Sequence, residues 1–153
     1  MKSRKTIGAI LTGFLFALFI LTRLDVVAAE KSPMDDLAIK GYDTVAYFKD
    51  GKAIKGSESF TFQWHGMTWH FLTEENRDLF AASPEKYAPR YDGYCAWAMT
   101  EARKAQTDPE LWKIVDGKLY LNCNRTAYEN WSRDIPGNIK KADENWIKFY
   151  GGN

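Results

Sequence analysis

Hydrophobic and polar residues alternate along residues 60–71, which read FTFQWHGMTWHF. A tight turn at His65-Gly66 would pair two short strands and separate their side chains onto two faces. One face would carry Phe60, Phe62, Trp64, Met67, Trp69 and Phe71, and the other Thr61, Gln63, Thr68 and His70. One apolar and one polar face are typical of a half-buried antiparallel hairpin.

The segment after this hairpin predicts a helix. Thr73 can cap its N-terminus, and the acidic residues of its first turns favour the positive end of the helix dipole. The helix should bury Leu79 and Phe80. Pro84 disfavours helical geometry at Ser83, so the helix should end there or a new turn should start.

Upstream, residues 38–48 predict a turn at Gly41-Tyr42-Asp43 and then a strand from Val45 to Phe48. Residues 30–37 read as a mobile lead-in. Asp43 is interpreted first as a turn former whose carboxylate binds nearby backbone amides. An alternative is a role in a polar ligand pocket, for which Tyr42, Asp43, Tyr47 and Tyr94 are the candidate ligand-binding residues.

The pattern of hairpin and helix continues in the second half of the chain. Asp116-Gly117 is the strongest two-residue turn signal and predicts a hairpin from Trp112 to Leu121. Helices are expected from Cys95 to Arg103, from a cap at Thr126 to Asp134, and from Asn138 to Phe149, with Pro136-Gly137 separating the last two. These elements predict an α+β fold in a single domain.

Residues 1–29 have the form of a secretory signal. Lys2, Arg4 and Lys5 precede an apolar run from Ile7 to Thr22, and small residues at 27–29 offer a cleavage point. The run is shorter than the ~20 residues that a spanning helix needs. The prediction is a periplasmic or secreted protein without membrane insertion after cleavage, and the alternative is an uncleaved N-terminal anchor.

Composition narrows the choice of partner. The formal net charge is +1 and charged residues make up 27% of the chain, so no strong field points to nucleic acid. Aromatic residues reach 15%, which suits a small domain that buries large area with few side chains.

The stretch WHGMTWHFLTEENRDLFAASPEKYA, together with GYDTVAYF upstream, resembles the YHS domain. The matching positions are Gly66, Trp69, Phe71, Thr73, Phe80, Pro84, Lys86 and Tyr87. The resemblance covers about residues 38–91 and implies the hairpin-helix fold. Residues 92–153 then resemble the C-terminal extension of a secreted branch of the family.

YHS domains that handle copper or mercury usually carry cysteines at three places in this unit. Here those places hold Ala46, Leu72 and Asn76. Thiolates select soft metals, so this departure removes the ligands on which a heavy-metal role would rest.

Other donors are candidates for a metal site. Cys95 and Met99 would lie one helical turn apart, and with His70, or alternatively His65, as a third donor they could hold copper or zinc. The alternative is that both sulfur residues belong to the buried stripe of a helix. A disulfide between Cys95 and Cys123 is a further possibility, although nothing in the sequence places the two close together.

Three functions follow from these residues. The leading hypothesis is a non-enzymatic YHS-type module that binds a metal ion or small molecule. A thiol-dependent enzyme or redox protein built on Cys95 is the second. A protein-interaction domain with an exposed aromatic face is the third.

Overall fold

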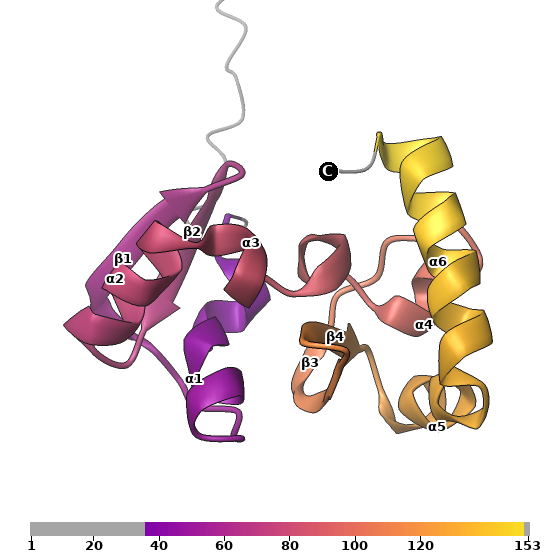
Figure 1. Cartoon of the computed structure of the whole chain (residues 1–153), viewed down its shortest axis with the longest axis horizontal. Coiled ribbons are helices and arrows are strands. Elements are labelled where there is room, and N and C mark those ends of the chain that lie inside the picture. The colour runs from indigo at the N-terminus through magenta and orange to yellow at the C-terminus, as the bar shows by residue number, and fades with distance from the viewer. Residues whose placement is uncertain (1–35, 152–153) are drawn as a thin grey trace, which may run out of the picture. The chain divides into compact units, whose positions relative to one another are not determined.

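Two short antiparallel hairpins, each followed by helices, organise the computed structural model, which describes residues 36–151 (Figure 1). The predicted signal segment at 1–29 and most of the lead-in at 30–37 lie outside this range. No helix within the range is long and apolar enough to cross a membrane. The mixture of small hairpins and helices confirms the predicted α+β class.

The elements occur twice in the same order: a 3-10 turn, a short helix, two strands and two helices. The first set is η1 (Ala38–Gly41), α1 (Thr44–Lys49), β1 (Ser57–Trp64), β2 (Met67–Phe71), α2 (Glu74–Ala82) and α3 (Pro84–Tyr87). The second is η2 (Arg90–Gly93), α4 (Ala96–Met99), β3 (Asp108–Val115), β4 (Lys118–Asn122), α5 (Arg125–Arg133) and α6 (Ile135–Tyr150). We refer to them as the first and second units.

The register of the first hairpin is largely as predicted. Trp64 lies opposite Met67 and Phe62 opposite Trp69, about the His65-Gly66 turn. The expected pairing of Phe60 with Phe71 is wrong, because the register shifts between Ser57 and Thr61 and brings Ser57 opposite Phe71. Such a bulge adds residues to one strand, which strict alternation does not show.

The strand predicted at Val45–Phe48 is wrong, because this segment forms helix α1. The Asp43 side chain accepts hydrogen bonds from the backbone N–H groups of Val45 and Ala46, at 2.8 and 3.3 Å. This N-cap satisfies the free donors of the first turn. Capping and tertiary contacts outweigh the strand preference of a four-residue apolar run.

The second hairpin also forms about its predicted turn, with Trp112 opposite Leu121 and Ile114 opposite Leu119. The helix expected over Cys95–Arg103 is shorter than predicted and ends at Met99. A residue soon after it, Ala102, has a positive φ of 54° and so leaves helical geometry.

Two helix boundaries in the second unit differ from those expected. The N-cap of α5 is Asn124, whose side chain accepts from the N–H of Ala127 at 2.9 Å, and the prediction of Thr126 is wrong. The prediction that Pro136-Gly137 separates the last two helices is also wrong. The break lies at Asp134, which caps α6, and Pro136 is in the first turn of α6. Proline is well tolerated there, since the first-turn N–H groups have no partner within the helix.

The two units share backbone conformation and strand register as well as the order of their elements. Three successive residues have positive φ in each 3-10 turn, namely Ile39-Lys40-Gly41 and Tyr91-Asp92-Gly93. Both units share a register shift near the start of the hairpin, at Ser57/Thr61 and at Asp108/Trp112. The second unit therefore repeats the local architecture of the first.

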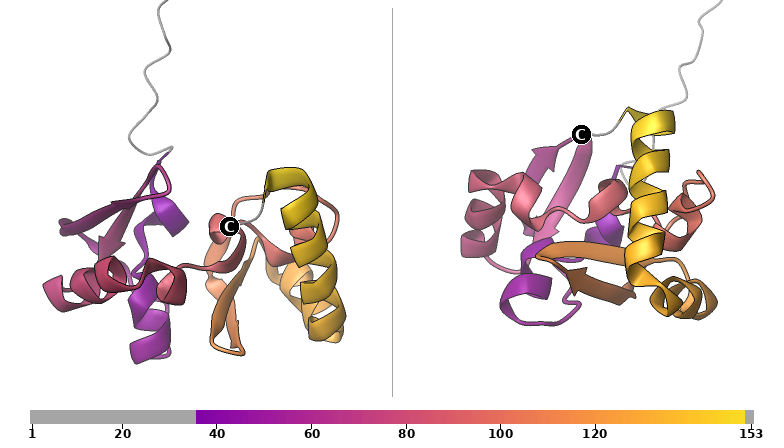
Figure 2. Two further views of the ribbon diagram at one scale, coloured as in Figure 1. Left: turned by 45° about the horizontal axis from the view of Figure 1, so that its top comes forward. Right: turned by 45° about the vertical axis from the view of Figure 1, so that its right-hand side comes forward.

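The β3–β4 hairpin lies between the first unit and α6 in every view (Figure 2). Leu119 and Leu121 join the core of the first unit, which contains Trp69 and Phe80. Between them, Tyr120 points to the other side and joins a second core, with members that include Trp131 and Trp146. Alternation along β4 thus connects the two cores.

Candidate functional site

A groove of about 700 Å³ lies where η1 meets the first hairpin. Its lining residues come from both units: Leu37, Lys40, Lys55, Gly56, Glu58, His70 and Gln106. We call it the His70 groove. Two lysines and one glutamate give its lining a formal charge of +1 before His70 is counted, which favours an anionic occupant.

His70 projects from the polar face of β2, as the alternation predicts. Its ring lies against the backbone of Gly41, because a Cβ added there would come within 3.3 Å of the ring Nδ1. The residue is half-buried, and over residues 36–151 its ring has no hydrogen bond or ion pair with another side chain or the backbone. Polar groups that are shielded from solvent usually have a hydrogen-bond partner. Because the described protein groups do not supply one to the His70 ring, its nitrogens are open to a ligand or water.

The backbone that carries Lys40 into the groove is unusual. Ile39 and Lys40 have φ values of 40° and 55°, in the left-handed region. A β-branched residue rarely adopts this region, and Ile39 does so while buried beside Gly93 of the second unit. Strained backbone of this kind is often found at ligand sites and is held in place by its surroundings.

Tyr42 lies at the edge of this region. It forms an isolated antiparallel bridge with Lys55, whose Nζ lies 5.5 Å from the centroid of the Tyr42 ring. The cation–π contact orients the Lys55 side chain. Of the four candidate ligand-binding residues, Tyr42 is therefore the one that borders the groove.

Asp43 is fully buried and its carboxylate is occupied by the fold. Besides capping α1, its Oδ2 accepts from the N–H of Leu72 at 2.8 Å and from Asn76 Nδ2 at 2.6 Å. The carboxylate thus joins α1, the end of β2 and α2. This arrangement matches the interpretation of Asp43 as a binder of backbone amides.

The other two tyrosines lie in different surroundings. Tyr47 is buried, donates its hydroxyl to the carbonyl of Pro109 at 3.0 Å, and has a raised pKa mainly because of burial. Tyr94 is half-buried, with Lys104 Nζ 5.0 Å from its ring centroid. Neither residue lines the His70 groove.

Cys95 is fully buried at the N-cap of α4. Its Sγ accepts from the N–H groups of Cys123 and Ala98, at 3.2 and 3.5 Å, and lies 3.9 Å from Asn122 Oδ1. Burial is the main cause that raises the pKa of the Cys95 thiol to about 11. The thiol is therefore protonated at neutral pH, which makes it a weak nucleophile.

The structure does not bring the three proposed metal donors into one cluster. Met99 is fully buried in the second core, and Cys95 packs with Ala98 and Ala127, while His70 faces its groove. Within residues 36–151, no group of three or more His, Cys, Asp or Glu side chains has the geometry to hold a metal ion.

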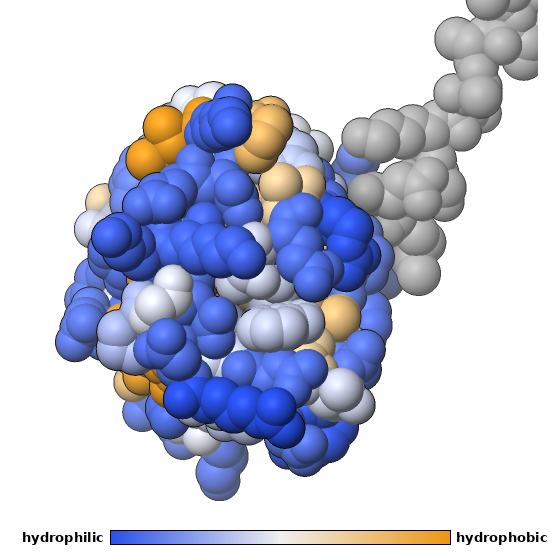
Figure 3. Space-filling model, turned by 90° about the vertical axis from the view of Figure 1, so that its right-hand side faces the viewer, coloured by the Kyte–Doolittle hydropathy of each residue, from blue (hydrophilic) through white to orange (hydrophobic). Residues whose placement is uncertain are grey.

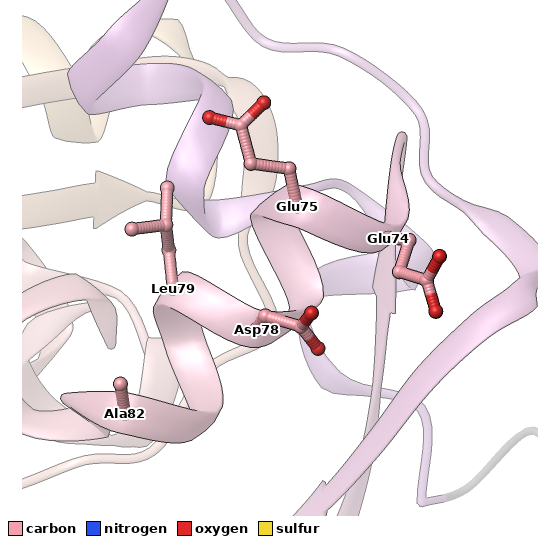
Figure 4. A pocket seen from close by; sticks show the side chains of 5 residues that line it. All are labelled: Glu74, Glu75, Asp78, Leu79 and Ala82. Carbon is pink, nitrogen blue, oxygen red and sulfur yellow. The ribbon is translucent and has the colours of Figure 1, made fainter.

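A second hollow of about 470 Å³ runs along the exposed side of α2 (Figure 4). Figure 4 shows the Glu75 side chain pointing away from those of Glu74 and Asp78, which lie on the same side of α2. Glu75 pairs with Lys49 at 2.9 Å, and Arg77 pairs with the other two. Because Lys49 and Arg77 already neutralise these carboxylates, the hollow is a poor candidate for a cation site.

Exposed apolar area is scattered on the face that carries α6 (Figure 3). In the described part of the chain, the exposed large hydrophobic side chains are Leu72, Ile147 and Phe149. The aromatic side chains of the first hairpin are half-buried or buried. An exposed aromatic face, which the interaction hypothesis requires, is therefore not formed by this hairpin.

Sequence reasoning identified His70 but missed its neighbours in the groove. Lys40 lies in η1, while Lys55 and Gln106 lie on two loops, and the three segments approach one another only in the folded chain. The run of left-handed residues at 39–41 could have been suspected only at its glycine, because glycine alone favours that conformation.

Together, the fold and the groove define a small α+β domain built of hairpin-helix units, with an open polar site for a small ligand. Residues 45–91, which run from α1 into the start of η2, match the model of the YHS domain family. No curated protein and no solved structure matches the chain.

The buried thiol and tyrosine hydroxyl groups predict a loss of stability in alkaline solution. The pKa values of Cys95, Tyr47 and Tyr91 are raised, chiefly by burial, so the folded state holds these protons more tightly than the unfolded state. The free energy of unfolding should therefore fall as the pH rises above about 8.5, where an unfolded thiol begins to ionise.

Urea denaturation between about pH 8 and pH 11 would measure this slope. A Cys95→Ser variant should show a shallower decline than the wild type, because serine does not titrate in this range. Equal slopes would contradict the raised pKa of Cys95.

Proposed function

We propose that the protein is a non-catalytic binding module, exported by its N-terminal segment, that holds a small organic anion in the His70 groove. The observation that carries the proposal is the half-buried His70 ring, which has no partner within residues 36–151 and shares a groove with two lysines. The groove volume of about 700 Å³ falls in the range of small-molecule sites.

Each lining group has a distinct task in this proposal. Lys40 and Lys55 attract a carboxylate or phosphate and confine it by charge. His70 donates a hydrogen bond from one ring nitrogen. The side-chain amide of Gln106 can bind a second polar group of the ligand, and the strained turn at Ile39 fixes the position of Lys40.

A non-catalytic role is supported by the state of the most reactive candidate group. Cys95 is buried and protonated at neutral pH, and no histidine is among its hydrogen-bond partners in the described range. A thiol enzyme needs a base within reach of the sulfur and an open cleft.

A metal ion is the second candidate ligand, because the YHS family is suggested to bind metal. In the His70 groove the donors would be the imidazole of His70 and the carboxylate of Glu58. Two protein donors leave most of the coordination sphere to water, so weak binding of zinc or copper is expected.

The chain contains only two histidines, which makes a site-specific test simple. We would follow the ring resonances of His65 and His70 by NMR while titrating succinate, inorganic phosphate and Zn(II) in separate experiments. His65 lies at the hairpin turn, stacked on Trp64, and serves as an internal control.

An anion should shift the His70 resonances in a saturable way and leave those of His65 unchanged. A Lys40→Ala, Lys55→Ala double variant should weaken this binding several-fold, whereas Lys113→Ala, an exposed lysine of β3, should not. A response to Zn(II) alone would favour the metal module instead. If no probe moves His70, the groove is not the ligand site.

A further inference from the structure

The two cysteines of the chain, separated in sequence, meet in the second unit. Cys95 caps α4 and Cys123 directly follows β4. The backbone N–H of Cys123 donates to Cys95 Sγ at 3.2 Å.

The repeated architecture explains why these two positions meet. In the first unit the cap of α1 is Asp43, and the residue after β2 is Leu72. The N–H of Leu72 donates to Asp43 Oδ2 at 2.8 Å, as the N–H of Cys123 does to the Cys95 sulfur. Contact between the helix cap and the residue after the second strand is thus a property of the fold, and the second unit has a cysteine at each position.

The two thiols differ in access. Cys95 is fully buried, in a small cluster with Ala98 and Ala127. Cys123 is half-buried and packs against the edge of this cluster, and its Sγ accepts a hydrogen bond from Asn124 Nδ2 at 3.6 Å. A reagent in solution can therefore reach Cys123 first.

We propose that Cys95 and Cys123 are a redox-active pair, which closes into an intramolecular disulfide when a small-molecule or protein disulfide oxidises it. The inference does not depend on the His70 groove. Closing the pair would tie the start of α4 to the end of β4, where a hydrogen bond now connects them.

The reaction has two exchange steps. The Cys123 thiolate attacks one sulfur of the oxidant R–S–S–R, which forms a mixed disulfide and releases one R–S⁻ that takes up a proton. Cys95 then loses its proton and attacks the Cys123 sulfur, which releases the second R–SH. Two protein thiols are oxidised by two electrons in total, and one disulfide is reduced to two thiols.

The second step should be the slower one at neutral pH. The raised pKa of Cys95 leaves little of it as thiolate, and only the thiolate attacks. The rate of closure should therefore increase as the pH rises toward the pKa of Cys95.

The test uses the reduced full-length chain with oxidised glutathione as the oxidant, under native conditions, followed by intact mass spectrometry. The chain has two cysteines, so loss of two hydrogen atoms without added glutathione identifies the Cys95–Cys123 bond. Peptide mapping would confirm the linkage. Circular dichroism would verify that the starting protein is folded.

Two variants separate the steps. Cys95→Ser should stop at one bound glutathione on Cys123, and Cys123→Ser should react at least tenfold more slowly than the wild type because Cys95 is buried. Wild-type protein that stops at the glutathione adduct, or that only forms intermolecular dimers, would overturn the proposal, and the wild-type result does not depend on how the variants fold.

Discussion

Asp43→Ala is expected to lower the free energy of unfolding by roughly 3–5 kcal/mol. The substitution removes the cap of α1 and leaves the partly buried N–H of Leu72 and the buried amide of Asn76 without their acceptor. Urea denaturation followed by circular dichroism would measure the loss. A smaller loss is expected for Asp43→Asn, which keeps one carbonyl oxygen as an acceptor.

The matched control is Asp78→Ala on the exposed side of α2. Asp78 pairs with Arg77 at the surface, so its removal should change stability by less than about 1 kcal/mol. If Asp43→Ala and Asp78→Ala had similar effects, the carboxylate of Asp43 would not be the connection between α1, β2 and α2.

Trp131→Ala should destabilise the protein by roughly 3–5 kcal/mol, as truncation of a large buried aromatic side chain does. Trp131 is fully buried on α5 and packs against Tyr120 with tilted rings, whose centroids are 5.4 Å apart. In the first unit Phe80 is equally buried on α2, and Phe80→Ala should have a comparable cost. Differential scanning calorimetry would measure both.

Both variants should still unfold in a single transition. The β3–β4 hairpin supplies Leu119 and Leu121 to one core and Tyr120 to the other, so neither core can open without exposing residues of the other. Two separated transitions in either variant would contradict this coupling.

Two further variants serve as controls for the loss of stability in Trp131→Ala. Phe149→Ala removes a ring that is 53% exposed and should cost less than about 1 kcal/mol. Trp131→Phe should be much milder than Trp131→Ala, because the buried Trp131 Nε1 has no hydrogen-bond partner in the described structure and phenylalanine removes this unsatisfied donor.

Local signals predicted the parts of the fold that depend on neighbouring residues. The turns at His65-Gly66 and Asp116-Gly117 set both hairpin registers near the turn, and Thr73 caps α2 with a 3.1 Å hydrogen bond from the N–H of Asn76. Alternation also placed His70 on the polar face. These features require only short-range geometry.

Features that depend on distant residues were missed. The Val45–Phe48 segment is helical partly because its cap, Asp43, is held from the other side by Leu72 and Asn76. The proximity of Cys95 and Cys123 likewise results from packing between α4 and β4, across 28 positions in sequence. No periodicity within a short window contains that information.

The candidate site likewise has one residue that local sequence could identify and others that depend on distant contacts. His70 could be identified as a polar residue on a strand face, whereas its grouping with Lys40, Lys55 and Gln106 depends on how η1 and two loops converge. Asp43 was assigned to backbone amides by its position in a turn, and its contacts support that assignment.

The shared hairpin also affects where the protein can be cut. The YHS match ends at residue 91, but the core around Trp69 and Phe80 is completed by Leu119 and Leu121 from β4. A fragment that stopped at the family boundary would expose the apolar side of its own core to water and would tend to aggregate. The limits of the sequence family are therefore not the limits of the folding unit.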